Sequence, residues 1–204
     1  NIVYEERKGW EYFWIVDPLD GTKEFIKRNG EFTVNIALIH NGYPLLGVVY
    51  VPVTKELYFS VIPDGAYKVS EVVPDKNAKY SYEELIAIAQ RLPFSIDRNS
   101  IIIVESRSHT SPETLEYIDE LKNKYNKVES ISRGSSLKMC MIAEGGADIY
   151  PRLSLSSEWD TAAGQAIVEG AGFQVVTYES AERMCYNKEE LINPWFIVKG
   201  KISL

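Results

Sequence analysis

The sequence predicts an α/β protein whose first half is α+β and whose second half is α/β. Apolar and polar residues alternate over residues 32–39, the period of a half-buried strand, and Asn41-Gly42 then supplies a hairpin turn. After residue 98 the pattern changes, because β-branched runs begin to alternate with amphipathic helices. We therefore expect a boundary near residue 98 that divides the chain into units 1–98 and 99–204.

The first half should form an antiparallel meander closed by one helix. Its strands are expected over residues 32–39, 45–51, 57–61 and 66–69. The apolar face of the first strand holds Val34, Ile36 and Leu38. Ser81 and Glu84 form a capping box, and apolar residues follow at helical spacing up to residue 92.

The second half should alternate strands with helices. Strands are expected over residues 101–104, 128–131, 147–150, 173–176 and 196–198. Helices are expected over residues 112–125, 135–144 and 161–169. The first of these helices starts at Ser111-Pro112, and the other two end at glycine-containing stretches. Because no flexible linker separates the halves, we expect them to pack closely.

Composition excludes several classes of function. The chain of 204 residues has a formal net charge of −7, which argues against general binding of nucleic acid, because its phosphates need a basic surface. Cys140 and Cys185 fit neither a disulfide framework nor a zinc site. No apolar run approaches the roughly 18 residues that a transmembrane helix needs. The expected location is the cytoplasm, either free or as a peripheral protein at the inner membrane.

Two carboxylates lie three residues apart in the segment Asp17-Pro18-Leu19-Asp20-Gly21-Thr22, directly after an apolar strand ending. Together with the Leu19 carbonyl, they could converge on a hard cation, and oxygen ligands favour Mg²⁺, Mn²⁺ or Ca²⁺ over zinc. Both aspartates could equally be ordinary turn residues, since Asp, Pro and Gly are common in turns.

A third carboxylate, Asp160, lies in the distant segment Trp159-Asp160-Thr161-Ala162-Ala163-Gly164 at the start of a predicted helix. Taken alone, Asp160 would be read as a helix N-cap. Its occurrence together with the first segment favours a shared metal site.

These segments match the DPxDGT and WDxAAG motifs, and the chain resembles the Li⁺-sensitive, Mg²⁺-dependent phosphatases of the inositol monophosphatase superfamily. Residues 23–35 and 134–138 extend the resemblance to the branch of CysQ-type 3'(2'),5'-bisphosphate nucleotidases. The resemblance implies a layered α-β-α-β-α sugar-phosphatase-like fold with a meander sheet and a second, mixed sheet. It also implies that residues 1–98 bind metal and that residues 99–204 bind substrate.

The implied activity is removal of the 3'-phosphate of adenosine 3',5'-bisphosphate, with 3'-phosphoadenosine 5'-phosphosulfate as a further substrate. By resemblance, Asp17, Asp20, Asp160 and the Leu19 carbonyl ligate two or three Mg²⁺ ions, which activate a water molecule for in-line attack. Gly21 and Thr22 would offer N–H groups to the phosphate, and the Thr22 hydroxyl would orient the water. The same chemistry on an inositol or sugar phosphate is the alternative.

The resemblance also suggests residues for the nucleotide. His109 would lie near the nucleoside, Arg152 near the phosphate that does not react, and Ser135, Ser136 and Lys138 near ribose and phosphate. The start of the helix at residues 134–138 would suit an anion held on backbone N–H groups. The alternatives are that the two serines cap this helix, that Lys138 and Arg152 are solvated cations and that His109 is structural.

The family also uses a glutamate upstream of the first motif as metal ligand and water activator. Only sixteen residues precede Asp17, and the sequence begins without an initiator Met, so we expect this glutamate to lie before Asn1. A non-catalytic protein that binds metal and phosphate is therefore a further alternative. The expected partner is a small nucleotide, and a homodimer is also compatible with the sequence.

Overall fold

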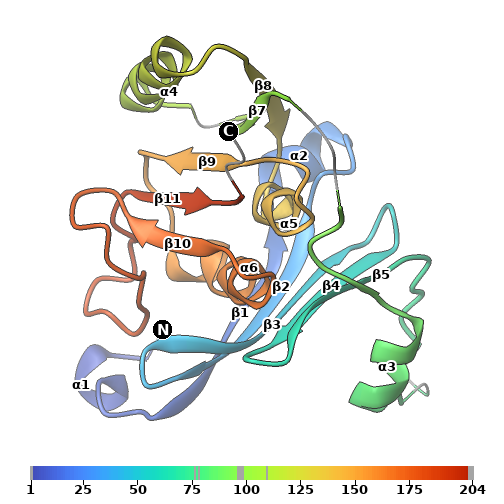
Figure 1. Ribbon diagram of the computed structural model, residues 1–204. Helices are drawn as coiled ribbons and strands as arrows, with labels where there is room; N and C mark the ends of the chain where they lie inside the picture. The colour runs from blue at the N-terminus through green and yellow to red at the C-terminus, as the bar shows by residue number, and fades with distance from the viewer. Residues whose placement is uncertain (1, 76, 78, 96–98, 109, 202–204) are drawn as a thin grey trace.

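The computed structural model describes residues 2–75, 77, 79–95, 99–108 and 110–201. The first half forms a six-stranded antiparallel sheet with the strand order β1-β2-β3-β4-β5-β6 (Figure 1). Its strands are β1 (Tyr12–Asp20), β2 (Thr33–His40), β3 (Tyr43–Val51), β4 (Glu56–Val61), β5 (Gly65–Val69) and β6 (Gln90–Arg91). The predicted meander is confirmed.

The second half forms a mixed five-stranded sheet with the order β10-β11-β9-β7-β8. β7 runs parallel to β8 and β9, whereas β11 is antiparallel to both of its neighbours. The strands are β7 (Ile101–Ser106), β8 (Val128–Arg133), β9 (Ile149–Arg152), β10 (Gln174–Thr177) and β11 (Phe196–Lys199). The predicted boundary near residue 98 lies outside the described residues.

The helices complete five layers. They are α1 (Tyr4–Arg7), α2 (Thr22–Lys27), α3 (Tyr82–Ile88), α4 (Pro112–Lys124), α5 (Leu137–Ala143) and α6 (Glu158–Gly170). Figure 1 shows α5 and α6 between the two sheets, with α3 beyond the first sheet and α4 beyond the second. This arrangement confirms the expected α-β-α-β-α layering. The main apolar core contains residues of both halves, as the prediction of close packing requires.

Helix α6 packs closely on the first sheet because small residues face each other there. A Cβ atom added to Gly47 of β3 would lie 2.5 Å from the carbonyl oxygen of Ala163 and 2.6 Å from the Cβ of Ala166. On β2, the buried residues are Thr33, Asn35, Ala37 and Ile39, which lie on the face that α6 covers. The alternate residues of β2 are only half-buried. Alternation correctly predicted the strand, but its more apolar face is not the one that α6 covers.

Several boundaries differ from the sequence prediction. The DPxDGT aspartates lie inside β1, an edge strand that tolerates Pro18, and not in a turn that follows a strand. Helix α6 begins at Glu158, and Ser157 is its N-cap, so the N-cap interpretation of Asp160 is wrong. The short helices α1 and α2 were not predicted, since four and six residues carry too little periodicity.

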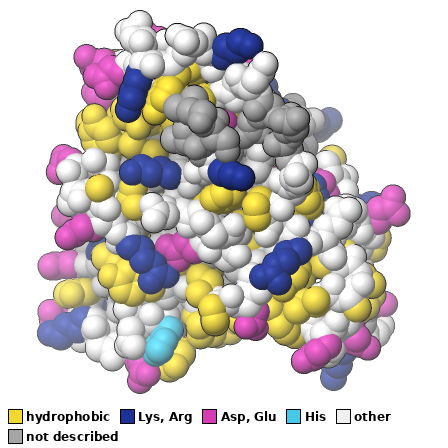
Figure 2. All heavy atoms as spheres, viewed as in Figure 1, with side chains coloured by type: hydrophobic (Ala, Val, Ile, Leu, Met, Phe, Trp, Pro, Cys, Tyr) yellow, Lys and Arg dark blue, Asp and Glu magenta, His cyan; other side chains and the backbone are white. Residues whose placement is uncertain are grey.

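The structure shows where the basic side chains and the cysteines lie and how long and apolar the helices are. On the face shown in Figure 2, Lys and Arg side chains occur as separate groups divided by apolar and uncharged atoms. No described helix combines the length and the apolar character that a membrane crossing requires. Both cysteines are free thiols, with Cys140 buried and Cys185 exposed.

Candidate metal and phosphate site

A β-bulge in β1 brings the first two aspartates to one face of the sheet. Asp17 pairs with Asn35 of β2, and Asp20 pairs with Thr33, so three steps along β1 match two steps along β2. Residues three apart in a regular strand point to opposite faces, and the extra residue of the bulge reverses this. Asp17 and Asp20 thus lie on the same face of the sheet as the buried residues of β2, and this face points toward the middle helix layer.

The Asp20 carboxylate is held by both halves of the chain. Its Oδ2 accepts hydrogen bonds from the backbone N–H of Ser136 at 2.7 Å and from the Ser136 hydroxyl at 2.8 Å. The Thr33 hydroxyl and the Asn35 side-chain amide each lie 3.3 Å from the same oxygen. These four contacts all fall on Oδ2, and they fix the orientation of the carboxylate.

Asp160 reaches the same site from the first turn of α6. Its Oδ2 accepts the backbone N–H of Ser157 at 2.8 Å. Burial, followed by the charges of Asp20 and Asp17, raises the pKa of Asp160 to about 6, although the Ser157 hydrogen bond opposes the rise. Burial and the neighbouring Asp20 also raise the pKa of Asp17, against a 2.9 Å hydrogen bond from the Leu19 N–H.

The three carboxylates fit a metal site. Asp17, Asp20 and Asp160 each offer one oxygen atom, and these atoms lie within 4.8 Å of one another. Like charges this close disfavour ionisation, and a bound cation would relieve their repulsion. The all-oxygen donor set matches hard cations such as Mg²⁺. The role of the Leu19 carbonyl as a ligand stays a prediction.

A cavity of about 490 Å³ opens beside this cluster, between α2, α5 and α6. Gly21, which lines the cavity, is the N-cap of α2 and has a left-handed backbone conformation (φ +86°). A Cβ atom added to Gly21 would lie 3.0 Å from the Cβ of Ser135. The predicted site residues that line the cavity are Asp20, Gly21, Thr22, Ser135, Ser136, Lys138, Arg152 and Asp160. The structure thus brings together residues from both halves of the chain.

Lys138 is buried, so its interpretation as a solvated cation is wrong. Its Nζ donates to the Ser135 carbonyl at 2.7 Å and lies 5.2 Å from the centre of the Tyr150 ring. Burial lowers the pKa of Lys138 to about 8. Arg152 is half-buried, and its guanidinium donates to the Ser106 hydroxyl at 3.3 Å and to the Leu155 carbonyl at 2.7 Å.

Two N–H groups of the turn at residues 134–136 donate to the protein's own carboxylates. Gly134 donates to Glu31 at 2.7 Å, and Ser136 donates to Asp20, so these two groups are not free for a substrate anion. Ser136 occupies the N-cap position of α5 but makes no capping hydrogen bond with its side chain. Its hydroxyl serves Asp20 instead.

Two acidic residues near the cavity were not predicted. Glu24 on α2 is only 3% exposed, lines the cavity and accepts the Ser108 hydroxyl at 2.7 Å. Glu31 forms a two-bond ion pair with Arg107 at 2.8 and 2.9 Å. Both lie in the segment 23–35 on which the family resemblance drew, but their local sequence does not predict their burial. His109 lies outside the described residues.

Comparison with known proteins shows the family of this chain. The family model described as the inositol monophosphatase family matches residues 3–201. The chain is 42% identical over 196 residues to the 3'(2'),5'-bisphosphate nucleotidase CysQ of Salmonella typhimurium, covering 96% of this chain and 71% of that protein. CysQ of Escherichia coli K12 is 41% identical over 195 residues, with the same coverage.

A solved structure has a similar fold. The crystal structure of CysQ from Bacteroides thetaiotaomicron, described as a bacterial member of the inositol monophosphatase family, superimposes with a TM-score of 0.95 at 54% identity. The superposition covers all of this chain and 75% of that one. The carboxylate cluster, the layered fold and the sequence similarity therefore lead to one conclusion: the chain belongs to the inositol monophosphatase family.

Proposed function

We propose that this protein is a Mg²⁺-dependent phosphomonoesterase that removes the 3'-phosphate of adenosine 3',5'-bisphosphate. One observation carries the proposal. Two members of the three-aspartate cluster, Asp20 and Asp160, line the same cavity as two cationic side chains, Lys138 and Arg152. In this proposal the cavity holds both phosphates of one small molecule, and the related CysQ proteins are named as bisphosphate nucleotidases.

In this proposal Asp17, Asp20 and Asp160 hold two or three Mg²⁺ ions with the Leu19 carbonyl. Bound Mg²⁺ supplies positive charge for the departing oxygen and lowers the pKa of a water molecule. Gly21 and Thr22, at the start of α2, position the reacting phosphate, and the Thr22 hydroxyl orients the attacking water.

The second phosphate distinguishes this substrate from an inositol or sugar monophosphate. Lys138 and Arg152 would bind the phosphate that does not react, with Ser135 beside the ribose and His109 beside the nucleoside. An inositol or sugar monophosphate has no group for these cations. Since charge-assisted hydrogen bonds contribute about 1.5–3 kcal/mol each, we expect kcat/KM to be at least about tenfold higher for the bisphosphate. 3'-Phosphoadenosine 5'-phosphosulfate offers a similar second anion and would be a further substrate.

Phosphate release by the protein as its gene encodes it tests the proposal. The substrates are adenosine 3',5'-bisphosphate, 3'-phosphoadenosine 5'-phosphosulfate, inositol 1-phosphate and fructose 1,6-bisphosphate, each with millimolar Mg²⁺. Faster turnover of inositol 1-phosphate would favour the sugar-phosphate alternative. Binding of Mg²⁺ and substrate without phosphate release would favour a non-catalytic protein.

A further inference from the structure

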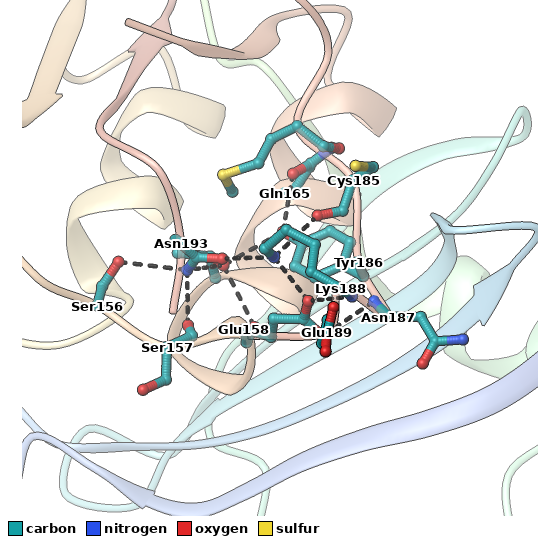
Figure 3. Close-up of polar contacts among 12 residues, drawn as sticks. Ser156, Ser157, Glu158, Gln165, Cys185, Tyr186, Asn187, Lys188, Glu189 and Asn193 are labelled. Carbon is teal, nitrogen blue, oxygen red and sulfur yellow. Dashed lines mark hydrogen bonds and ion pairs between the residues drawn. The ribbon is translucent and has the colours of Figure 1, made fainter. Parts of the chain in front are cut away.

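A polar network holds the first turn of α6, the turn that carries Asp160. The segment from residue 184 to residue 193 folds across this turn, and Figure 3 shows its side chains meeting the side chains of Ser156 and Glu158 and the backbone of Ser157. Within this network, Lys188 lies between Glu158 and Asn193. None of these contacts belongs to the metal cluster itself.

Glu158 is the first residue of α6, and its side chain is only 3% exposed. One carboxylate oxygen, Oε1, accepts the Lys188 Nζ at 2.6 Å and the Lys188 backbone N–H at 3.0 Å. The other oxygen accepts the backbone N–H of Asn187 at 3.0 Å. A buried carboxylate is stable only when it is paired in this way, so the contacts tie the helix start to residues 187–188.

Asn193 is buried and ties the same helix start to the residues before it. Its side-chain amide donates to the Ser157 carbonyl at 2.7 Å, the Ser156 hydroxyl at 3.2 Å and the Thr161 hydroxyl at 3.0 Å. The Lys188 Nζ donates to the Asn193 side-chain oxygen at 3.4 Å. Lys188 thus orients Asn193 as well as Glu158.

The network ends at a metal ligand. Ser157, which Asn193 holds through its carbonyl, donates its own backbone N–H to Oδ2 of Asp160. We propose that Lys188 and Asn193 are positioning residues that set the direction of the Asp160 carboxylate toward the metals, an inference that rests on the proposed function. Groups that orient metal ligands change metal affinity by about 10- to 100-fold when they are lost.

Calorimetric titration with Mg²⁺ alone tests the inference in the intact protein. Lys188→Met should weaken Mg²⁺ binding about tenfold or more, and saturating Mg²⁺ should restore much of kcat. Glu158→Gln combined with Lys188→Met removes the ion pair without leaving a buried charge, and it serves if the single variant does not fold. Asn193→Ala should weaken Mg²⁺ binding in the same direction.

The same helix offers a matched control at its other end. Arg183 pairs with Glu169 in the last turn of α6 at 2.6 and 2.9 Å, and Arg183 belongs to the same C-terminal part of the chain as Lys188. Arg183→Met removes this ion pair far from Asp160. We expect it to change Tm but to leave the Mg²⁺ affinity within about twofold of the unmodified protein, since the side-chain hydrogen bonds of Arg183 and Glu169 join these two residues and Gln165, and none of these reaches residues 156–160.

The outcomes separate the inference from the proposed function. Mg²⁺ binding by the unmodified protein, weakened by the Lys188 and Asn193 variants but not by Arg183→Met, supports the inference. Equal Mg²⁺ affinity in all folded variants, or an equal loss in the Arg183 control, overturns the positioning role alone. If the unmodified protein binds no Mg²⁺, the proposed function fails and the inference fails with it.

Discussion

Lys138 should hold the second phosphate only while its ammonium group is charged, which makes substrate preference depend on pH. Burial is the main cause that lowers the pKa of Lys138 from 10.5 to about 8, and Arg152 adds to it, whereas the charge of Asp20 opposes it. The charged form therefore predominates below pH 8 and is lost as the pH rises above this value. The preference for a bisphosphate should therefore be several-fold weaker at pH 9 than at pH 7.

The size of this change follows from the charged fraction. A lysine with a pKa of about 8 is roughly 90% charged at pH 7 and roughly 10% charged at pH 9. If its charge contributes about 10- to 100-fold to kcat/KM, the preference for adenosine 3',5'-bisphosphate over inositol 1-phosphate should fall about five- to ninefold between these values. Any titration of the metal site cancels in the ratio of the two kcat/KM values, because both reactions depend on the metal site.

The assay is phosphate release at constant ionic strength and saturating Mg²⁺, repeated for two variants. Lys138→Arg keeps a positive charge at both pH values, so its preference should not change with pH. Lys138→Met should lower the preference at pH 7 by about 10- to 100-fold and also remove its pH dependence. A preference that is independent of pH in the unmodified protein, or one that still falls in Lys138→Met, would refute this reasoning.

Three further predictions concern the metal cluster. Asp20→Asn should abolish Mg²⁺-dependent turnover without changing the circular dichroism spectrum, because a neutral amide replaces a shared carboxylate; near-normal kcat would remove Asp20 from the site. Because burial and neighbouring carboxylates raise the pKa of Asp160 to about 6, and only its ionised form binds a cation, Mg²⁺ affinity measured by calorimetry should fall about tenfold from pH 7 to pH 5. An equal fall in Asp160→Asn would show that another group is responsible. Li⁺ on the order of tens of millimolar should slow turnover without weakening substrate binding, because a monovalent ion lacks the charge that phosphoryl transfer needs. Full activity at such Li⁺ concentrations would contradict this prediction.

The sequence was sufficient to predict the sheets and the three aspartates that the structure brings together. Alternating side chains and turn residues are local features, so the strands of the meander and the helices of the second half could be predicted within a few residues. The aspartates could be predicted because two short motifs contain them together with the glycine that their surroundings need. Gly21, for example, has a φ of +86° and no room for a side chain.

The sequence could not predict burial or hydrogen-bond partners across long separations. Lys138 and Arg152 carry the same charge in the sequence, yet Lys138 is buried, which lowers its pKa, whereas Arg152 is only half-buried. The two serines of the turn before α5 also look alike, but only Ser136 donates to Asp20, which lies 116 residues away.

The sequence by itself therefore determined the fold class, the two motifs and the kind of cation they suit. The tertiary structure decided how each carboxylate is held, and which distant residues hold it. Glu158 and Lys188 show the difference, since 30 residues separate them and neither belongs to a motif named from the sequence. The physical reason is that backbone periodicity acts over a few residues, whereas the pairing of a buried charge depends on which segments the core brings together.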